Sequence, residues 1–199
     1  MIEEIVIATR NTGKVRELTA LLEHVVEKVT SLREVNSVPE IIEDGDTFRM
    51  NALKKARLVS DITRKITLAD DSGLEVDGLG GRPGVFSSRY AGENASDKDN
   101  IRKLLEELNG ISDRKARFVC DLALVFPNGE EIVVEGICDG VILEQPRGEG
   151  GFGYDPVFFL PDVNKTMAEL TAEEKNLISH RARAIRALTM YINGQDPKE

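Results

Sequence analysis

Two adjacent carboxylates, Asp70 and Asp71, are the densest chemical signal in the sequence, within the segment Leu68-Ala69-Asp70-Asp71-Ser72-Gly73-Leu74. The apolar residues before them are typical of the end of a buried strand. Because neighbouring negative charges repel and are costly to bury, a cation or a hydrogen-bond network must compensate them. Mg²⁺ suits such a pair, since it takes one or two carboxylates and completes its shell with water and phosphates. The alternative is a polar turn that ends a strand.

A polar loop near the N-terminus, Thr9-Arg10-Asn11-Thr12-Gly13-Lys14, leads from an apolar run into a helical pattern. Backbone N–H groups at a helix start, together with a lysine, favour the binding of an anion such as phosphate. The spacing of a Walker motif is absent. A helix entry with a solvated lysine is the alternative.

Two further segments carry groups that could recognise a nucleotide. Phe152-Gly153-Tyr154-Asp155 combines an aromatic face for stacking, a glycine that permits close backbone approach, and a carboxylate. Lys175 and Ser179-His180-Arg181 gather cations and hydrogen-bond donors near a predicted helix start. The alternatives are aromatic side chains that cover the edge of a core and a solvated basic helix face.

The elements that must position these residues alternate between strand and helix patterns. Capping signals at Thr47, Ser96 and Thr171 predict three helix starts, and Ser179 could begin a further segment. Strands are expected over residues 4–9, 66–69, 116–126 and 130–142, the last two as a hairpin, and helices over 15–25, 47–60, 97–108 and within 171–192. The pattern predicts an α/β domain with a mixed sheet, active groups lying in loops after strands.

Composition limits the partners. The 199 residues include 26 Lys and Arg against 35 Asp and Glu, a formal net charge of −9, which argues against binding along a nucleic-acid backbone. The N-terminal apolar run is too short for a signal peptide or a membrane span, so we expect a cytoplasmic protein. In that reducing compartment, Cys120 and Cys138 are expected to be buried free thiols rather than a disulfide.

Taken in order, five segments resemble the inosine triphosphate pyrophosphatase family of non-canonical purine nucleotide hydrolases, from about Ile5 to Ala187. They are TRNTGK; EDGDTF with Asn51-Ala52; ADDSGLEVDGLGGRPG with SSRYAG; GGFGYDPVF; and EKNLISHR. The resemblance implies hydrolysis of ITP, dITP and XTP to the monophosphate and pyrophosphate. It also implies one elongated, two-lobed α/β domain over residues 1–194 with a cleft between lobes, usually in a homodimer. Residues 195–199 are expected to form a frayed tail.

The resemblance also assigns roles by motif match. It implies that Asp71 is the proton acceptor and that Asp71, Asp70 and Glu43 hold Mg²⁺, with Mn²⁺ as an alternative. The implied substrate contacts are Thr9, Arg10, Asn11, Thr12, Gly13, Lys14, Ser72, Phe152, Gly153, Tyr154, Asp155, Lys175, His180 and Arg181.

Three other functions compete with this one. A catalytically inactive nucleotide sensor would keep the binding residues without turnover, and the intact Asp70-Asp71 pair argues against it. A related pyrophosphatase for modified pyrimidines or methylated nucleotides would not be expected to carry the SHR and FGYD segments. A nucleic-acid-binding module conflicts with the acidic composition.

Overall fold

The computed structural model describes residues 1–35 and 38–195. Apart from Gln195, the tail expected at 195–199 lies outside the described residues. The helices are α1 (Thr12–Leu22), α2 (Phe48–Thr63), α3 (Asp97–Glu107), α4 (Ala172–Ile178) and α5 (His180–Ile192). The strands are β1 (Ile2–Ile7), β2 (Val26–Ser31), β3 (Thr67–Val76), β4 (Lys115–Val125), β5 (Glu131–Ile142), β6 (Phe158–Leu160) and β7 (Lys165–Thr166).

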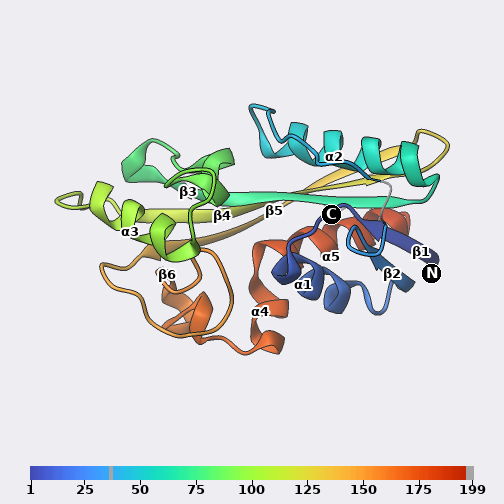
Figure 1. Ribbon diagram of the computed structural model, residues 1–199. Coiled ribbons are helices and arrows are strands. Elements are labelled where there is room, and N and C mark those ends of the chain that lie inside the picture. Colours follow the sequence, from blue (N-terminus) through green and yellow to red (C-terminus); the bar gives the residue numbers. More distant parts are fainter. Residues whose placement is uncertain (36–37, 196–199) are drawn as a thin grey trace. The chain divides into compact units, whose positions relative to one another are not determined.

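The strands form a mixed sheet in the order β2-β1-β3-β4-β5-β6-β7, which confirms the predicted α/β class (Figure 1). β1 pairs in parallel with both β2 and β3, whereas β6 pairs antiparallel with β5 and with β7. The expected hairpin joins β4 to β5 through a tight turn in which the Phe126 N–H donates to the Glu130 carbonyl at 2.9 Å.

The predicted helix starts are confirmed by their caps. The Thr47 hydroxyl accepts a hydrogen bond from the Met50 N–H at the start of α2. Capping boxes begin α3 at Ser96 and α4 at Thr171, so each satisfies backbone donors that would otherwise lack a partner. Ser179 directly precedes α5.

One strand was not predicted, and one expectation about a strand was wrong. Residues 26–31 form β2, which was missed because the sequence VEKVTS lacks the apolar alternation that marks a strand; Glu27 and Lys28 are exposed. β3 runs through Asp70, Asp71 and Ser72 to Val76, so the two carboxylates lie inside a strand and not in a loop after one. The first helix also ends earlier than predicted, at Leu22.

The chain divides into two compact units. The first unit comprises Met1–Asp71, Cys120–Gly136 and Arg181–Glu199, and the second comprises Ser72–Val119 and Ile137–His180. β3, β4 and β5 therefore each contribute residues to both units.

The first unit has a core on each face of its part of the sheet. Successive side chains along each strand point to opposite faces of the sheet. Ile5, Ile7 and Leu68 pack with apolar residues of α1 and α5, whereas Val6 and Ala69 pack with those of α2. Figure 1 shows α2 on one side of these strands and α1 and α5 on the other.

The second unit has its own core. α3 contributes Ile101 and Leu104, which pack with Phe118 of β4 and Phe158 of β6. The rings of Phe118 and Phe158 are 4.3 Å apart between centroids. Cys138 is buried in this core and Cys120 in that of the first unit, both as the free thiols that the sequence predicts.

Candidate active site

Strand alternation sends Asp70 and Asp71 to opposite faces of β3. Asp70 lies on the side of Leu68, toward α1 and α5, and Asp71 lies on the side of Ala69, toward α2. The side chains that pair with the two carboxylates differ: Lys14 and Arg181 pair with Asp70, whereas Lys55 pairs with Asp71.

Asp70 is the centre of a buried ionic cluster in the first unit. Its side chain is fully buried, and its Oδ1 pairs with the Lys14 ammonium. Its Oδ2 accepts hydrogen bonds from the Arg181 Nε and the Cys120 thiol, each at 3.0 Å. Arg181 also donates to Glu17 of α1 at 2.9 Å. These contacts bring Lys14 and Arg181, from opposite ends of the chain, to one carboxylate.

Charge explains why Asp70 is ionised in spite of its burial. Burial raises the pKa of a carboxyl, but the positive charges of Arg181 and Lys14 outweigh that effect and hold the pKa of Asp70 well below its usual range. Burial likewise works against charged Arg181, yet Asp70 and Glu17 raise its pKa. Removal of either partner would leave a buried charge without its counter-charge.

Asp71 lies in a second cluster, built by α2 and the preceding loop. The Lys55 ammonium donates to Asp71 Oδ1 and Glu43 Oε1, each at 2.9 Å, and to the Asp70 carbonyl at the same distance. The Lys55 and Asp71 side chains are 5% and 7% exposed, whereas Glu43 is 36% exposed. A buried base is thus linked to a carboxylate at the protein surface.

The two carboxylates of this cluster have different proton affinities. Burial raises the pKa of Asp71 to about 6, against the charges of Lys55 and Lys14. Burial also acts on Glu43, but Lys55 outweighs it and lowers the pKa of that carboxyl. These opposite shifts leave Glu43 ionised at a lower pH than Asp71. Near neutral pH, Asp71 is poised as a base.

The predicted phosphate loop lies at the N-terminus of α1 in the first unit. The Asn11 side chain caps the helix by accepting from the Lys14 N–H at 3.1 Å, and the Thr9 hydroxyl accepts from the Asn11 N–H. Thr12 and Gly13 form the first helical residues, and Arg10 donates to the Val38 carbonyl. The arrangement supplies a helix N-terminus beside the Lys14 ammonium, as an anion site needs.

The predicted base-binding residues lie together in the second unit. Asp155 Oδ2 accepts from the Phe152 N–H at 3.0 Å and from the Lys175 ammonium at 2.6 Å. The Lys175 ammonium also lies 5.1 Å from the centre of the Phe152 ring. Asp155 and Lys175 are 3% and 7% exposed, so this loop offers a buried donor and acceptor beside an aromatic face.

Two hydrogen bonds anchor the same loop within the second unit, and its path requires a glycine. The Gly153 N–H donates to Asp97 at the start of α3 at 2.7 Å. The Tyr154 hydroxyl donates to the Ser87 carbonyl at 2.8 Å. A Cβ on Gly151 would lie 2.0 Å from Asp155 Oδ2, so only glycine allows the chain to pass this close to the carboxylate.

The remaining predicted residues also belong to the second unit. His180 is buried and stacks on Phe118 with ring centroids 4.8 Å apart and planes at 20°. Ser72 follows Asp71 in β3. The predicted residues thus form two sets, with residues 9–14, Glu43, Asp70, Asp71 and Arg181 in the first unit and the others in the second.

Glu43 and Asp71 fit a small divalent cation. Two hard oxygen donors already converge on one positive group, the Lys55 ammonium. In residues 1–35 and 38–195, no group of three or more His, Cys, Asp or Glu side chains is arranged to hold a metal. Mg²⁺ is usually bound by one or two carboxylates, with water and phosphate oxygens completing its shell, so the donor set suits such a cation.

Sequence reasoning missed Lys55, which connects Asp71 to Glu43. A signal was present, because Lys55 lies on the buried stripe of α2 with Phe48, Ala52, Ala56 and Val59. A lysine in such a stripe needs buried counter-charges. Glu17 and the Cys120 thiol were missed as well, and only contacts between distant segments reveal them. Asn51 belongs to a motif of the resemblance but had no assigned role; the structure bonds it to Gly45.

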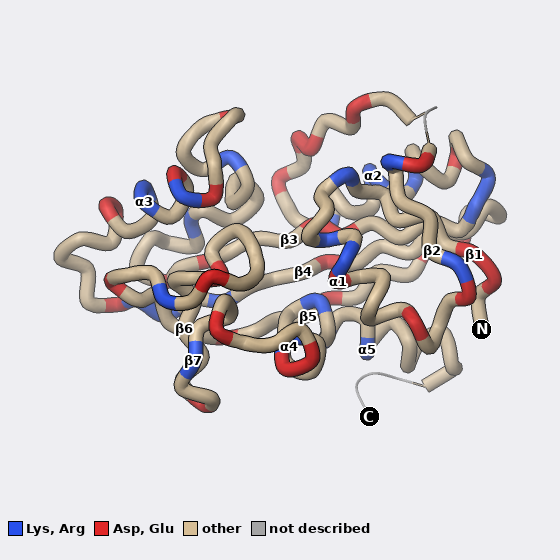
Figure 2. Tube along the Cα trace, turned by 60° about the horizontal axis from the view of Figure 1, so that its bottom comes forward, with Lys and Arg blue, Asp and Glu red and all other residues tan. Residues whose placement is uncertain are grey.

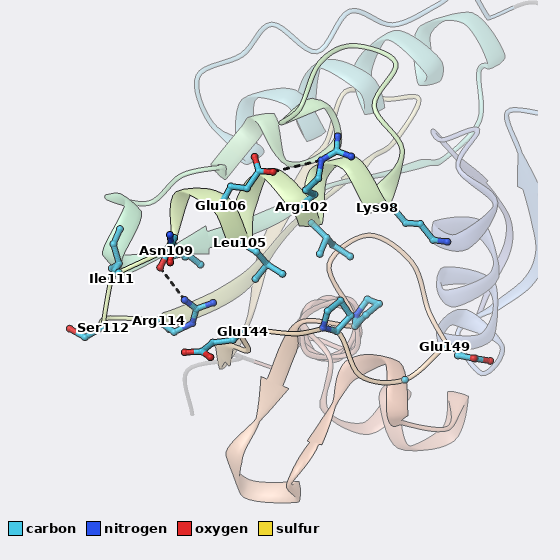
Figure 3. A pocket seen from close by; sticks show the side chains of 16 residues that line it. Lys98, Arg102, Leu105, Glu106, Asn109, Ile111, Ser112, Arg114, Glu144 and Glu149 are labelled. Atoms are coloured by element: carbon cyan, nitrogen blue, oxygen red, sulfur yellow. Dashed lines mark hydrogen bonds and ion pairs between the residues drawn. The ribbon is translucent and has the colours of Figure 1, made fainter.

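One described hollow lies away from the candidate site residues. It has a volume of about 1200 Å³ and lies in the second unit, beside α3. In Figure 3, Leu105 points from α3 toward this hollow, and Arg114 and Glu144 lie at its edge. None of the sequence-predicted site residues lines it, so its size carries no argument about the chemistry.

Charge is dispersed over the described chain. Figure 2 shows basic residues interspersed with acidic ones along the trace. This distribution agrees with the net charge of −9 in giving little support to a polyanionic partner. No helix in the described part of the chain is long and apolar enough to cross a membrane.

Comparisons with known proteins agree on one family. Residues 5–191 match the model of the Ham1 family. A dITP/XTP pyrophosphatase of Geobacillus kaustophilus (strain HTA426) is 56% identical over 188 residues, which are 94% of this chain and 92% of that protein. Solved Ham1 structures from Coxiella burnetii and Staphylococcus aureus align with TM-scores of 0.87 and 0.86, at 44% and 43% identity. They cover 97% and 96% of this chain, and 100% and 99% of their own chains.

Proposed function

This chain belongs to the Ham1 family, and from that premise we propose that it hydrolyses the non-canonical purine nucleotides ITP, dITP and XTP to the monophosphate and pyrophosphate. The observation that carries the proposal is the cluster of Asp71, Lys55 and Glu43, a buried base joined to a carboxylate that can meet a metal ion. A protein that only senses nucleotides would not need such a base.

In this mechanism Asp71 orients the attacking water and accepts its proton. The water oxygen forms a bond to the α-phosphorus, and the bond from that phosphorus to the bridging oxygen breaks, so pyrophosphate leaves with the electron pair. The raised pKa of Asp71 makes it a better base than an ordinary aspartate. Lys55 holds the carboxylate in place through the bond to its Oδ1.

Glu43 and Asp71 would hold Mg²⁺, or Mn²⁺ in its place. When bound, such an ion supplies charge neutralisation on the phosphates and makes a coordinated water more acidic. Asp70 could join these ligands only by giving up Lys14, Arg181 or the Cys120 thiol, and it lies on the other face of β3. We therefore assign Asp70 the role of counter-charge to the two cations.

Lys14 and Arg181 would bind the phosphates, together with the N–H groups at the start of α1. Both cations are already gathered at Asp70.

The Asp155–Lys175 pair would select the base. Hypoxanthine and xanthine present an N1–H donor and a 6-oxo acceptor, which match a carboxylate and an ammonium. Adenine presents an N1 acceptor and a 6-amino donor, the opposite pattern. Each buried polar group left without a partner costs about 1–3 kcal/mol, so two mismatches give strong discrimination. The Phe152 ring would stack on the base.

A nucleotide panel tests the function. With Mg²⁺, the purified protein should release pyrophosphate from ITP, dITP and XTP much faster than from ATP or GTP, and Asp71→Asn should abolish the release. Asp61→Asn, an exposed aspartate of α2 in the same unit, is the matched control and should keep full activity. Equal turnover of all five nucleotides, or phosphate as the product, would refute the assignment; binding without turnover would identify a sensor.

We also propose a cytoplasmic homodimer, as the family resemblance implies. Its expected mass in solution is twice that of the 22.0 kDa chain. Sedimentation velocity that gives the mass of one chain at micromolar concentration would exclude the dimer.

A further inference from the structure

Two buried side chains of α2, Asn51 and Lys55, hold the loop that carries Glu43. Residues 38–45 form no helix or strand. Asn51, in the first turns of α2, is 1% exposed. Its Oδ1 accepts from the Gly45 N–H at 2.8 Å, and its Nδ2 donates to the Gly45 carbonyl at 3.3 Å. One side-chain amide thus satisfies both backbone groups of Gly45.

The same face of α2 provides the second attachment. Lys55 follows Asn51 by four residues, so the two side chains project from neighbouring turns of the helix. Lys55 binds the Glu43 carboxylate while Asn51 binds the backbone two residues further along the loop. The neighbouring ion pair of Asp44 with Lys54 is exposed, and exposed pairs contribute little.

The contact leaves no room for a side chain on the loop. A Cβ on Gly45 would lie 2.7 Å from Asn51 Oδ1 and 3.0 Å from Met50 Cβ. The first distance is shorter than Cβ atoms show in proteins, and the second is tighter than most of their contacts. Gly45 therefore brings the loop backbone within hydrogen-bond distance of α2, and the segment from Glu43 to Gly45 contacts the side of the helix.

We propose that Asn51 is a positioning residue, which fixes the loop so that the Glu43 carboxylate is placed beside Asp71 to bind a divalent cation. The inference rests on the proposed function, because it assigns Glu43 to the metal. Groups that orient metal ligands typically change metal affinity 10- to 100-fold when they are altered. Loss of the Asn51 amide should weaken binding within that range, while the chemistry at saturating metal should change little.

Manganese binding by the nucleotide-free protein tests the proposal directly. Free Mn²⁺ is counted by electron paramagnetic resonance in titrations of the wild type, Glu43→Gln, Asn51→Ala and Thr47→Ala. Glu43→Gln should abolish binding, and Asn51→Ala should weaken it by about tenfold or more. Thr47→Ala removes the cap of α2 without touching Gly45, so it controls for a general loosening of the helix and should bind Mn²⁺ within about twofold of the wild type.

Gly45→Ala provides an independent route to the same contact. It keeps Asn51 but forces the loop away, so it should reproduce the weak binding if Asn51→Ala does not fold. In the double variant the two effects should not add, because both changes break one contact. Circular dichroism and thermal unfolding establish that each variant is folded.

Several results would overturn the inference. Asn51→Ala could bind Mn²⁺ with wild-type affinity, or Thr47→Ala could lose as much Mn²⁺ affinity as Asn51→Ala does. The wild type could show no saturable Mn²⁺ binding, or Mn²⁺ binding could survive in Glu43→Gln. The hydrolysis assay is separate: a protein that binds Mn²⁺ as expected but does not cleave ITP would refute the proposed function and leave the role of Asn51 in place.

Discussion

Asp70 and Asp71 are neighbours in the chain, yet they differ in nearly every physical respect. Asp70 is held ionised by Lys14 and Arg181, whereas burial raises the pKa of Asp71 to about 6. The cause is the period of the strand, which points one carboxylate toward α1 and α5 and the other toward α2. A counter-charge and a base can therefore occupy successive positions and form ion pairs with different side chains.

The raised pKa of Asp71 predicts a pH dependence for metal binding. A carboxyl with a pKa near 6 is largely protonated at pH 5 and largely ionised at pH 7, and only the ionised form binds a cation. Mg²⁺ affinity should therefore fall as the pH is lowered from about 7 to about 5, and binding near pH 6 should release protons. Calorimetry in buffers of different ionisation enthalpy measures both. An affinity that is constant over this range would contradict the assignment of Asp71.

Asp70 predicts a large effect on stability. Asp70→Ala leaves Arg181 and Lys14 without their shared counter-charge, and removal of one partner from a buried ion pair costs about 3–5 kcal/mol. Urea unfolding measures the free energy of unfolding of the variant against that of exposed Asp61→Ala, which should lie within about 0.5 kcal/mol of the wild type. A loss below about 1 kcal/mol for Asp70→Ala would show that the cluster is not required for stability.

Among the elements, the helices position many of the proposed site residues, several of them from their first turns. α1 begins at the proposed phosphate loop, α2 carries both Lys55 and Asn51, and α3 begins at Asp97, which holds Gly153 of the base-binding loop. Helix starts suit this purpose because their first N–H groups and caps connect the helix to the chain before it.

The contact between α3 and the base-binding loop gives a prediction. Asp97→Ala removes the acceptor of the Gly153 N–H but leaves the capping box formed by Ser96 and Asp99. A hydrogen bond contributes about 0.5–1.5 kcal/mol, so KM for ITP should rise about two- to tenfold, with kcat nearly unchanged. Glu106→Ala, an exposed acidic residue later in α3, is the control. Steady-state kinetics with ITP makes the comparison, and an unchanged KM would rule out a positioning role for Asp97.

Helices with a capping signal and strands with a clear apolar alternation were predicted from the sequence. The caps at Thr47, Ser96 and Thr171 and the alternation of β4 act within a few residues, so they can be recognised in the sequence. The length of β3 could not be predicted in this way, because Asp70 and Asp71 have low strand propensity and are kept in the strand by cations from α1, α2 and α5. The role of Lys55 was missed although the residue lies on the buried stripe of α2, because its partners Glu43 and Asp71 are distant in sequence.

Across the whole molecule, the motifs taken together predicted the family and its reaction, which physical reasoning from single segments could not do. Each motif had an ordinary structural alternative, and their order along the chain connected them to one family. The structure adds the partners of each residue within its unit: those of the proposed phosphate and metal residues lie in the first unit, and those of the proposed base-binding residues in the second.

We propose that water attacks the α-phosphorus of a non-canonical purine triphosphate beside Asp71. Hydrolysis of ITP in water enriched in oxygen-18, followed by ³¹P NMR or mass spectrometry, locates the attacked phosphorus. We expect one labelled oxygen on the phosphate of IMP and none on the pyrophosphate. Label in the pyrophosphate, or release of labelled inorganic phosphate, would contradict it.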